Sequence, residues 1–299
     1  MRILVTGVTG QVGKALVAPL ARLGTVVPSD RSTLNLAEPA TLAGALDRLA
    51  PDLIINPAAY TAVDRAEDER NLAFTINGNA PGVMAEWAAR RKVPLVHFST
   101  DYVFNGQGKT PWREDSPTGP LSAYGASKLA GEEAIRAANG AHLIVRTSWV
   151  YAAQGANFLR TIARLARERT ELKIVADQMG APTSARIIAE EVAALLSADP
   201  ENLRERFAQA GGIINVAASG ETSWHGFATA IVEGLRSRRV VLAVQSIVPL
   251  RTEDYPTKAK RPHNSRFDLT RLREVFGVTT PSWREALERE IDLLAQEMR

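Results

Sequence analysis

The sequence has 299 residues and contains no cysteine. Without cysteine, neither a disulfide framework nor a thiolate metal site can form, and a reducing compartment is compatible with this composition. Long apolar runs are missing as well. The N-terminal stretch MRILVTGVTGQVG reaches glycine before it can form the apolar core of a signal peptide, and no stretch of about 18 apolar residues follows it. We therefore expect a cytoplasmic protein that does not contact a membrane.

Clusters of basic residues with interleaved aromatic residues are also absent. Lysine and arginine together number 36, and aspartate and glutamate 33, so the net charge is +3. The basic residues are scattered or alternate with acids, as in RLARERTELK (164–173). Because nucleic-acid-binding proteins concentrate positive charge on one face, we expect no nucleic acid partner. We attribute the small positive excess to solubility and to an anionic ligand.

The first half of the chain alternates short apolar runs with helical patterns. The apolar runs are rich in valine, isoleucine and leucine and are apolar on both faces, as are strands of a parallel sheet that is covered by helices. This alternation predicts an α/β fold with a doubly wound, Rossmann-type parallel sheet. The predicted strands span 2–6, 25–28, 52–56, 94–99 and 142–148, and the predicted helices 14–24, 39–50, 79–92 and 127–138.

Beyond residue 150 the alternation is looser. Segments 99–121 and 249–268 are rich in proline, glycine and polar residues, and loops of that length in a compact protein are usually functional. We predict a Rossmann-type domain at 1–150 and a smaller C-terminal α/β lobe at 151–299, from which some segments return to the main sheet. The lobe's predicted helices are 156–170, 184–196, 223–237 and 281–298, and its strands lie near 172–175, 213–217 and 241–247.

A glycine-rich turn follows the first predicted strand. The run GVTGQVG places Gly7, Gly10 and Gly13 between this strand and a helix. Such a turn lets the backbone approach a pyrophosphate closely, and the start of the helix offers unpaired N–H groups to it. The spacing is GxxGxxG rather than GxGxxG, so by itself it also fits an ordinary turn. Its position favours a dinucleotide and makes 1–150 an NAD(P)-binding domain.

The residues after the second predicted strand bear on the choice of cofactor. Asp30 lies 17 residues beyond Gly13, where a carboxylate meets the ribose hydroxyls of the adenosine. Asp30 favours the free 2′-hydroxyl of NADH. The neighbouring Arg31 either pairs with the 2′-phosphate of NADPH or lies in solvent. We predict NADPH or NADH and leave the choice open.

Polar residues also stand at the ends of later strands. Ser99, Thr100 and Asp101 emerge from the strand 94–99, and Trp149 closes the next one. The carboxyl ends of parallel strands meet at the crevice where such folds bind ligands. We therefore expect these side chains at one site, although a tryptophan at a strand end is more often buried in the core.

The run YGASK places Tyr124 and Lys128 four residues apart at the start of a helix, on one face. Alone, such a pair is more often a solvated surface pair. Hydride transfer to a carbonyl needs a proton donor and hydrogen bonds for the developing oxyanion. A tyrosine whose pKa is lowered by an ammonium group can donate that proton, and Thr100 can supply a second hydrogen bond. With the glycine turn upstream, catalysis is the better interpretation.

These runs resemble the extended short-chain dehydrogenase/reductase superfamily. Within it, several are similar to the dTDP-4-dehydrorhamnose reductase family, and they cover most of residues 1–184 and return at 255–268: NPAAYTAVDRAE, STDYVFNGQGKTPWRE, YGASKLAGE, RTSWVY, DQMGAPT and RPHNSRFD. The resemblance implies an oxidoreductase that uses NADPH or NADH to reduce the 4-keto group of dTDP-4-dehydro-L-rhamnose to dTDP-L-rhamnose. A nucleotide sugar is then the small-molecule partner, and residues 151–299 are mainly a substrate-binding lobe.

The resemblance also implies roles for individual residues. Tyr124 is the proton donor, Lys128 binds the nicotinamide ribose and lowers the tyrosine pKa, Thr100 tunes the tyrosine and the substrate oxygen, and Asp101 and Trp149 contact the sugar. The implied cofactor contacts are Gly10, Gln11 and Val12 at the pyrophosphate, Asp30 at the adenosine ribose, Asn35 and Leu36 at the adenine, and Ala58, Ala59 and Tyr60 along the cofactor backbone.

Two positions depart from the family pattern. Asn35 stands where aspartate is common, and asparagine still accepts a hydrogen bond. Arg186 follows APTSA where some members carry a glutamate that helps a metal ion bridge a dimer. Because a cation repels a cation, we predict no metal, and the sequence leaves monomer and homodimer open.

Other polar residues have a structural and a functional interpretation. His97, in the middle of a strand, is expected to be a satisfied core histidine rather than an acid or base. Asp64 either caps the following helix or touches the substrate, and we expect the cap. The basic loop KAKRPHNSR (258–266) either binds the substrate diphosphate or is solvated. Two alternative functions remain: a non-catalytic NADP-binding subunit that resembles the methionine adenosyltransferase β-subunit, and a reductase for another sugar nucleotide.

Overall fold

A computed structural model describes residues 1–298. Its centre is a six-stranded sheet in the order β10-β5-β4-β3-β1-β2, in which every pair of neighbours is parallel. The inner strands are buried along almost their whole length, as expected from runs that are apolar on both faces. The strands are β1 Arg2–Val5, β2 Thr25–Pro28, β3 Leu53–Asn56, β4 Leu95–Thr100, β5 His142–Thr147 and β10 Ile213–Asn215.

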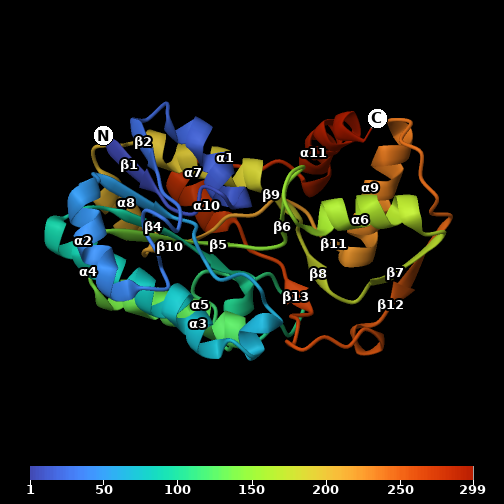
Figure 1. The fold of residues 1–299 in the computed structure, drawn as a ribbon, viewed down its shortest axis with the longest axis horizontal. Helices are drawn as coiled ribbons and strands as arrows, with labels where there is room; N and C mark the ends of the chain where they lie inside the picture. The colour runs from blue at the N-terminus through green and yellow to red at the C-terminus, as the bar shows by residue number, and fades with distance from the viewer. Residues whose placement is uncertain (299) are drawn as a thin grey trace.

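Helices cover both faces of this sheet (Figure 1). One face packs against α1, α7, α8 and α10, and the other against α2, α4 and α5. The doubly wound Rossmann-type fold predicted from the alternating pattern is therefore confirmed. The helices of the two layers are α1 Gln11–Leu20, α2 Pro39–Leu49, α4 Ala80–Arg91, α5 Ala123–Ala137, α7 Ala185–Ser197, α8 Leu203–Gln209 and α10 Thr270–Phe276.

The strand order places a crevice over the centre of the sheet. From β1 the chain proceeds to β2 on one side, and then returns to β3 on the other side of β1. Helices that leave neighbouring strands in opposite directions open a gap above the carboxyl ends of those strands, and this is where such folds bind ligands.

The smaller lobe lies beyond the carboxyl ends of the sheet strands, around α6, α9 and α11 (Figure 1). Its core joins these helices to the parallel pair β7–β12. The short strand pair β6–β9 and the three-stranded sheet β11-β8-β13 lie between it and the main sheet. The bounds are α6 Phe158–Glu168, α9 Trp224–Ser237, α11 Trp283–Glu297, β6 Val150–Tyr151, β7 Glu171–Val175, β8 Met179–Gly180, β9 Thr183–Ser184, β11 Thr222–Ser223, β12 Ser246–Leu250 and β13 Asn264–Ser265.

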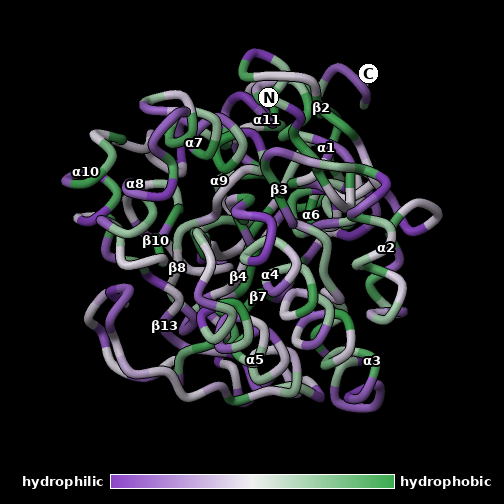
Figure 2. The backbone as a smooth tube through the Cα atoms, turned by 90° about the vertical axis from the view of Figure 1, so that its left-hand side faces the viewer, coloured by the Kyte–Doolittle hydropathy of each residue, from purple (hydrophilic) through white to green (hydrophobic). Residues whose placement is uncertain are grey.

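Segments from the second half of the chain lie in both lobes. The strand β10 extends the main sheet, and α7 packs against α1. Figure 2 shows apolar stretches along the central strands and polar stretches at the periphery. No helix within residues 1–298 combines the length and the apolar character needed to cross a membrane.

The structure contains short elements that the sequence pattern did not indicate. Between β3 and α4 lie the 3₁₀ helix η1 Arg65–Glu67, α3 Arg70–Phe74 and the π-helical turn η2 Thr75–Asn79; two further 3₁₀ turns are η3 Asp101–Val103 and η4 Thr252–Asp254. Elements of three to five residues are too short to display a clear apolar period. Segment 249–268, expected as a loop, contributes β13, which pairs with β8.

Candidate active site

One cavity of about 2040 Å³ lies over the carboxyl ends of the sheet strands, and its lining extends from the glycine turn into the smaller lobe. It brings together residues that are more than a hundred positions apart in the sequence. Every site residue predicted from the sequence lines it, namely Gly7, Gly10, Gln11, Val12, Gly13, Asp30, Arg31, Asn35, Leu36, Ala58, Ala59, Tyr60, Thr100, Asp101, Tyr124, Lys128 and Trp149.

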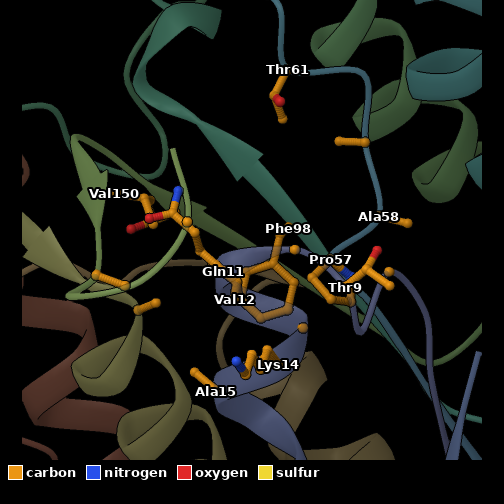
Figure 3. Close-up of a pocket in the computed structure, with 18 of the residues that line it drawn as sticks. Thr9, Gln11, Val12, Lys14, Ala15, Pro57, Ala58, Thr61, Phe98 and Val150 are labelled. Carbon is orange, nitrogen blue, oxygen red and sulfur yellow. The ribbon is translucent and has the colours of Figure 1, made fainter. Parts of the chain in front are cut away.

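The glycine turn needs its glycines. Gly7 has φ +58°, and a Cβ there would lie 3.0 Å from Cα of Ala58. A Cβ on Gly13 would lie 2.2 Å from the carbonyl oxygen of Gly7. Gly10 is the N-cap residue of α1 and has no side chain that could accept a hydrogen bond from the helix. The first N–H groups of the helix therefore remain available to a ligand. Figure 3 shows Thr9, Gln11 and Val12 at this end of α1, near Pro57 and Ala58.

The adenosine side of the cavity is formed after β2. The Asp30 carboxylate accepts hydrogen bonds from the backbone N–H and the hydroxyl of Ser32, which lower its pKa. Arg31 is exposed beside it. Asn35 accepts a hydrogen bond from the Ala37 N–H and donates one to Glu38. These two hydrogen bonds fix the Asn35 side chain in the turn that precedes α2.

The segment Ala58–Tyr60 is fixed by side chains that the sequence did not indicate as site residues. Thr6, just before the glycine turn, accepts the Ala58 N–H through its hydroxyl. Asn77 in η2 accepts the N–H of Tyr60 and donates to its carbonyl, and it also donates to Ser127 on α5. A buried asparagine bonded to both backbone groups of one residue acts as a clamp.

The helix α5 carries Tyr124 into the cavity. Ser122 caps it by accepting the N–H of Gly125 at 3.1 Å. Burial raises the pKa of the Tyr124 phenol, a hydrogen bond with the Thr100 hydroxyl lowers it, and the Asp101 carboxylate raises it further. The net shift is upward because burial dominates, so the expected net lowering of the Tyr124 pKa is wrong for the protein without its cofactor. The ring of Tyr102 packs edge-on against Tyr124.

Lys128 is buried, and its Nζ lies 3.1 Å from Nε2 of His97. Burial lowers the pKa of Lys128 to about 8, while Glu132 opposes the shift. His97 is fully buried, and burial and the Lys128 charge hold its pKa well below the ordinary value. His97 is thus neutral and hydrogen-bonded, which matches the expected core histidine, but its partner is the lysine of the YxxxK motif.

Asp101 is the buried acid of the cavity. Its carboxylate accepts hydrogen bonds from Thr100 at 3.0 Å and from Ser265 at 2.5 Å. Burial raises its pKa to about 6, against the effect of these hydrogen bonds. Ser265 belongs to β13 and reaches Asp101 across 164 residues of sequence. A carboxylate held in this way can accept hydrogen bonds from a sugar.

Trp149 adopts φ +49°, an uncommon conformation for a residue with a Cβ. Its ring stacks on Trp224 at a centroid distance of 3.6 Å, and a Cβ at Gly180 would lie 2.7 Å from it. Such strain persists only where the surroundings enforce it, and it is common at ligand sites. Trp224 also lines the cavity, and no sequence pattern predicted it.

A second set of residues that the sequence did not indicate joins the smaller lobe to α1 by hydrogen bonds. Asn157 donates to Gln11 at 2.9 Å, and Lys14 donates to Gln154 at 2.6 Å. Figure 3 shows the Gln11 side chain extending from α1 toward Val150. The run AAQGAN (152–157) carried a turn signal in its glycine, but nothing local indicated its position over the glycine turn.

Two further expectations meet the structure here. Asp64 stands at the N-cap position of the 3₁₀ helix that follows it, but its side chain forms no capping hydrogen bond there, so the predicted cap is wrong. Instead its carboxylate accepts the Ala259 N–H and pairs with Arg261, which ties the basic loop to the Rossmann domain. Arg186 pairs with Glu290 at 3.0 Å, which places a cation where a metal-bridging acid was considered.

The sheet, the uncapped helix at the glycine turn and the Thr100–Tyr124–Lys128 group define an extended short-chain dehydrogenase/reductase. The model of the RmlD substrate binding domain matches residues 1–296. The chain is 49% identical to dTDP-4-dehydrorhamnose reductase from Burkholderia thailandensis, over 99% of this chain and 100% of that protein. It is 39% identical to the Escherichia coli K12 enzyme of the same name, over 98% of each chain. This chain belongs to the dTDP-4-dehydrorhamnose reductase family.

Solved structures agree with this assignment. A dTDP-4-dehydrorhamnose reductase from Clostridium acetobutylicum superposes with a TM-score of 0.89 at 35% identity, over 98% of this chain and 99% of that one. A dTDP-4-dehydrorhamnose reductase from Bacillus anthracis, solved in complex with NADP, superposes with a TM-score of 0.88 at 34% identity, over 97% of this chain and 98% of that one.

Proposed function

We propose that this protein uses NADPH or NADH to reduce the 4-keto group of dTDP-4-dehydro-L-rhamnose to dTDP-L-rhamnose, with Tyr124 as the proton donor. The observation that carries the proposal is the convergence of Thr100, Tyr124 and Lys128 in one cavity with the glycine turn. The family's named activity and the NADP complex of a relative support it.

The cavity fits a dinucleotide. The start of α1 offers N–H groups to a pyrophosphate. Within residues 1–298, the buried hydroxyls of Ser99, Thr147 and Ser148 have no hydrogen-bond partner, and all three residues line the cavity. Unpaired buried hydroxyls are costly unless a ligand pairs with them. When bound, NADPH or NADH supplies the hydride that adds to the carbonyl carbon.

The protein's own residues then stabilise and protonate the oxygen of the substrate carbonyl. As the C–H bond forms, the carbonyl π pair becomes an alkoxide. The Thr100 hydroxyl, which donates to Asp101 in the structure, turns to this alkoxide and stabilises it with a hydrogen bond. The Tyr124 O–H bond breaks and its proton completes the alcohol. The raised pKa of Tyr124 keeps the phenol protonated, so that it has a proton to give to the more basic alkoxide. A Lys128 ammonium near the site favours the phenolate that results.

The site also supports roles in binding. We assign the sugar to Asp101 and Trp149, the pyrophosphate to residues 10–12, and the adenosine to Asp30, Arg31 and Asn35. The nucleotide sugar is the proposed partner. We keep the division into an NAD(P)-binding domain, 1–150, and a mainly substrate-binding lobe, 151–299, as part of the proposal.

The test is Tyr124→Phe, which removes the donated proton and keeps the ring. We expect kcat for NADPH oxidation with the 4-keto sugar nucleotide to fall by about 10²–10⁴-fold, the usual contribution of a positioned acid. The exposed Tyr255 provides the matched control, Tyr255→Phe, which should leave kcat unchanged. Product analysis by NMR identifies the sugar. An unchanged kcat in Tyr124→Phe contradicts the proposal, and turnover of another sugar nucleotide alone reassigns the substrate.

A further inference from the structure

A row of buried polar side chains runs behind the cavity, from the glycine turn to Lys128. Thr6 immediately precedes Gly7, and its hydroxyl lies 2.6 Å from the side-chain amide of Asn56. That amide lies 3.0 Å from Nδ1 of His97, and Nε2 of His97 lies 3.1 Å from Nζ of Lys128. The four residues come from the ends of β1 and β3, from β4 and from α5, so the row crosses three neighbouring strands.

The residues of this row are buried, so their polar groups depend on one another for hydrogen bonds. His97 is 0% exposed, Asn56 1% and Lys128 2%. A buried ammonium group needs hydrogen-bond acceptors as well as a counter-charge. Glu132 lies one turn further along α5, but both of its carboxylate oxygens accept hydrogen bonds from Arg146. Within residues 1–298, the hydrogen-bond partner of the Lys128 Nζ is His97.

The position of His97 also follows from the sheet register. Asn56 on β3 is the register partner of His97 on β4. Partnered residues of neighbouring strands project to the same face, so the amide and the imidazole lie side by side on the face that α5 covers. Both ring nitrogens of this buried histidine have a polar partner, as a buried imidazole needs, and one of these partners is Lys128.

We propose that His97 is a positioning residue of the reaction: its neutral ring accepts a hydrogen bond from the Lys128 ammonium at Nε2, and this contact aims the other N–H groups of the lysine toward the cavity. The proposal rests on the function proposed above for Lys128. Three N–H groups share one Nζ, so an acceptor that fixes the direction of one N–H restricts the other two.

This arrangement determines the tautomer of His97. With Nε2 as acceptor, Nδ1 carries the proton and must donate it, so the Asn56 amide must present its oxygen to the ring. In the structure Nδ2 of Asn56 faces Nδ1 instead, and Oδ1 of Asn56 accepts from the Thr6 hydroxyl. A rotation of that amide by 180° places the oxygen there and lets its NH₂ group donate to the Thr6 hydroxyl. The row then links the charged lysine to the residue before the phosphate-binding turn.

The charged groups near Lys128 and His97 are Glu132 on α5 and Arg146 on β5, and they affect the pKa of Lys128. Glu132 favours the ammonium form of Lys128, and Arg146 partly neutralises Glu132. Asn56 and Thr6, on the other side of the ring, are uncharged. Because an acceptor stabilises the ammonium, removing it lowers the pKa of Lys128, so the basic limb of the pH–rate profile should move to lower pH.

Two substitutions of His97 separate positioning from packing. His97→Gln places an amide group near the position of Nε2, whereas His97→Asn places one near Nδ1 and leaves Lys128 without its acceptor. We expect His97→Gln to retain kcat within about threefold, and His97→Asn to lose about tenfold or more, the usual effect of a charge-assisted hydrogen bond. His142→Gln, at a partly buried histidine bonded to the Gly140 carbonyl, is the control and should behave like the wild type.

The measurements are kcat and KM for NADPH across the neutral and basic pH range, NADPH binding by fluorescence, and thermal unfolding. In His97→Asn the basic limb should move down by about one pH unit, in step with the lost interaction. A merely structural role would lower the melting temperature of both variants and leave the limb in place. A His97→Asn variant with the wild-type rate and limb overturns the proposal.

A second measurement needs neither a variant that folds well nor a known sugar. In ¹⁵N-histidine NMR of the wild-type protein with NADP bound, the His97 ring should be neutral with an unprotonated Nε2 near neutral pH. Its signal is assigned by loss in His97→Gln. A protonated Nε2, or a ring that titrates near pH 6.5, the ordinary histidine value, contradicts the proposal. Because this result is independent of turnover, it stands even if the enzyme reduces a different sugar nucleotide.

Discussion

Gly13 cannot carry a side chain without opening the phosphate-binding turn, because its Cβ would lie 2.2 Å from the Gly7 carbonyl oxygen. The clash is with backbone, which cannot rotate away. We expect Gly13→Ala to raise KM for NADPH about tenfold or more and to lower the free energy of unfolding by about 1–3 kcal/mol, as overpacking does. Cofactor titration and urea unfolding measure the two effects.

Gly44 provides the matched control for this change. It lies exposed in the interior of α2, where an added Cβ would meet one side-chain atom, Nη1 of Arg48, at 3.7 Å. Gly44→Ala should stabilise the protein by about 0.5–1 kcal/mol because glycine is a poor helix former, and it should leave KM unchanged. Equal behaviour of the two variants would contradict the steric explanation.

The raised pKa of Asp101 predicts that kcat/KM for the sugar nucleotide depends on pH. Burial raises its pKa to about 6, so the carboxylate is charged above that pH and becomes neutral below it. A charged carboxylate is the stronger acceptor for sugar hydroxyls. We therefore expect kcat/KM for the sugar nucleotide to fall as the pH drops through about 6.

In Asp101→Asn this acidic limb should disappear, and kcat/KM at neutral pH should fall about tenfold to a hundredfold, the cost of a charge-assisted hydrogen bond. Ser265→Ala is the companion variant. It removes a hydrogen bond that lowers the pKa of Asp101, so the limb should move to higher pH. A limb that persists in Asp101→Asn would assign it to another group.

At the scale of elements, the start of α5 determines where Tyr124 stands. Ser122 caps the helix through the Gly125 N–H, and the Ala123 N–H is bonded to Glu67 of η1. Ser122→Ala should cost about 1 kcal/mol of stability, as loss of an N-cap does. Because Tyr124 lies in the same first turn, we also expect kcat to fall severalfold, measured by NADPH oxidation.

The cap of α11 provides the comparison. Ser282 forms a capping box with Glu285 at the start of that helix, which lies in the smaller lobe. Ser282→Ala should lower stability by a similar amount, about 1 kcal/mol, and leave kcat unchanged. If both variants lose activity in proportion to stability, the effect at Ser122 is not local.

The elements also show how far local sequence determines structure. The predicted strand 25–28 coincides with β2, and the other four strands of the first half agree within one residue at either end. Their signal is strong because buried parallel strands are continuous apolar runs. The helix α1 begins at Gln11 instead of the predicted 14, and α3 and η2 were missed. Short and π-helical turns depend on tertiary partners such as the Asn77 clamp on Tyr60.

At the scale of the whole molecule, the basic loop of the C-terminal half is tied to the Rossmann domain through Arg261. Its guanidinium pairs with Asp64 at 2.5 Å and lies near Tyr102, whose ring packs edge-on against Tyr124. Arg261→Gln should increase hydrogen exchange in segment 255–263 and raise KM for the sugar nucleotide severalfold, because this link orders the cavity wall.

Lys258 in the same loop is the control. It pairs with Asp68, but both side chains are more than half exposed. Exposed ion pairs contribute about 0–1 kcal/mol. Lys258→Ala should therefore leave exchange in this segment and KM close to the wild-type values. If Lys258→Ala has the same effect as Arg261→Gln, the loop acts through its net charge and the specific link to Asp64 is not required.

The sequence by itself determined the sheet strands, the glycine turn and the placement of Tyr124 and Lys128 on one helix face, because apolar periodicity, turn chemistry and the YxxxK spacing are local properties. Other predicted lining residues, such as Asn35 and Ala58, came from the family resemblance. Only the tertiary structure decided what surrounds them. The bond from Ser265 to Asp101 spans 164 residues, Trp224 on α9 stacks on Trp149, and the Lys128 ammonium lies against the buried ring of His97. Such partners are chosen by the packing of distant elements, which no local pattern records.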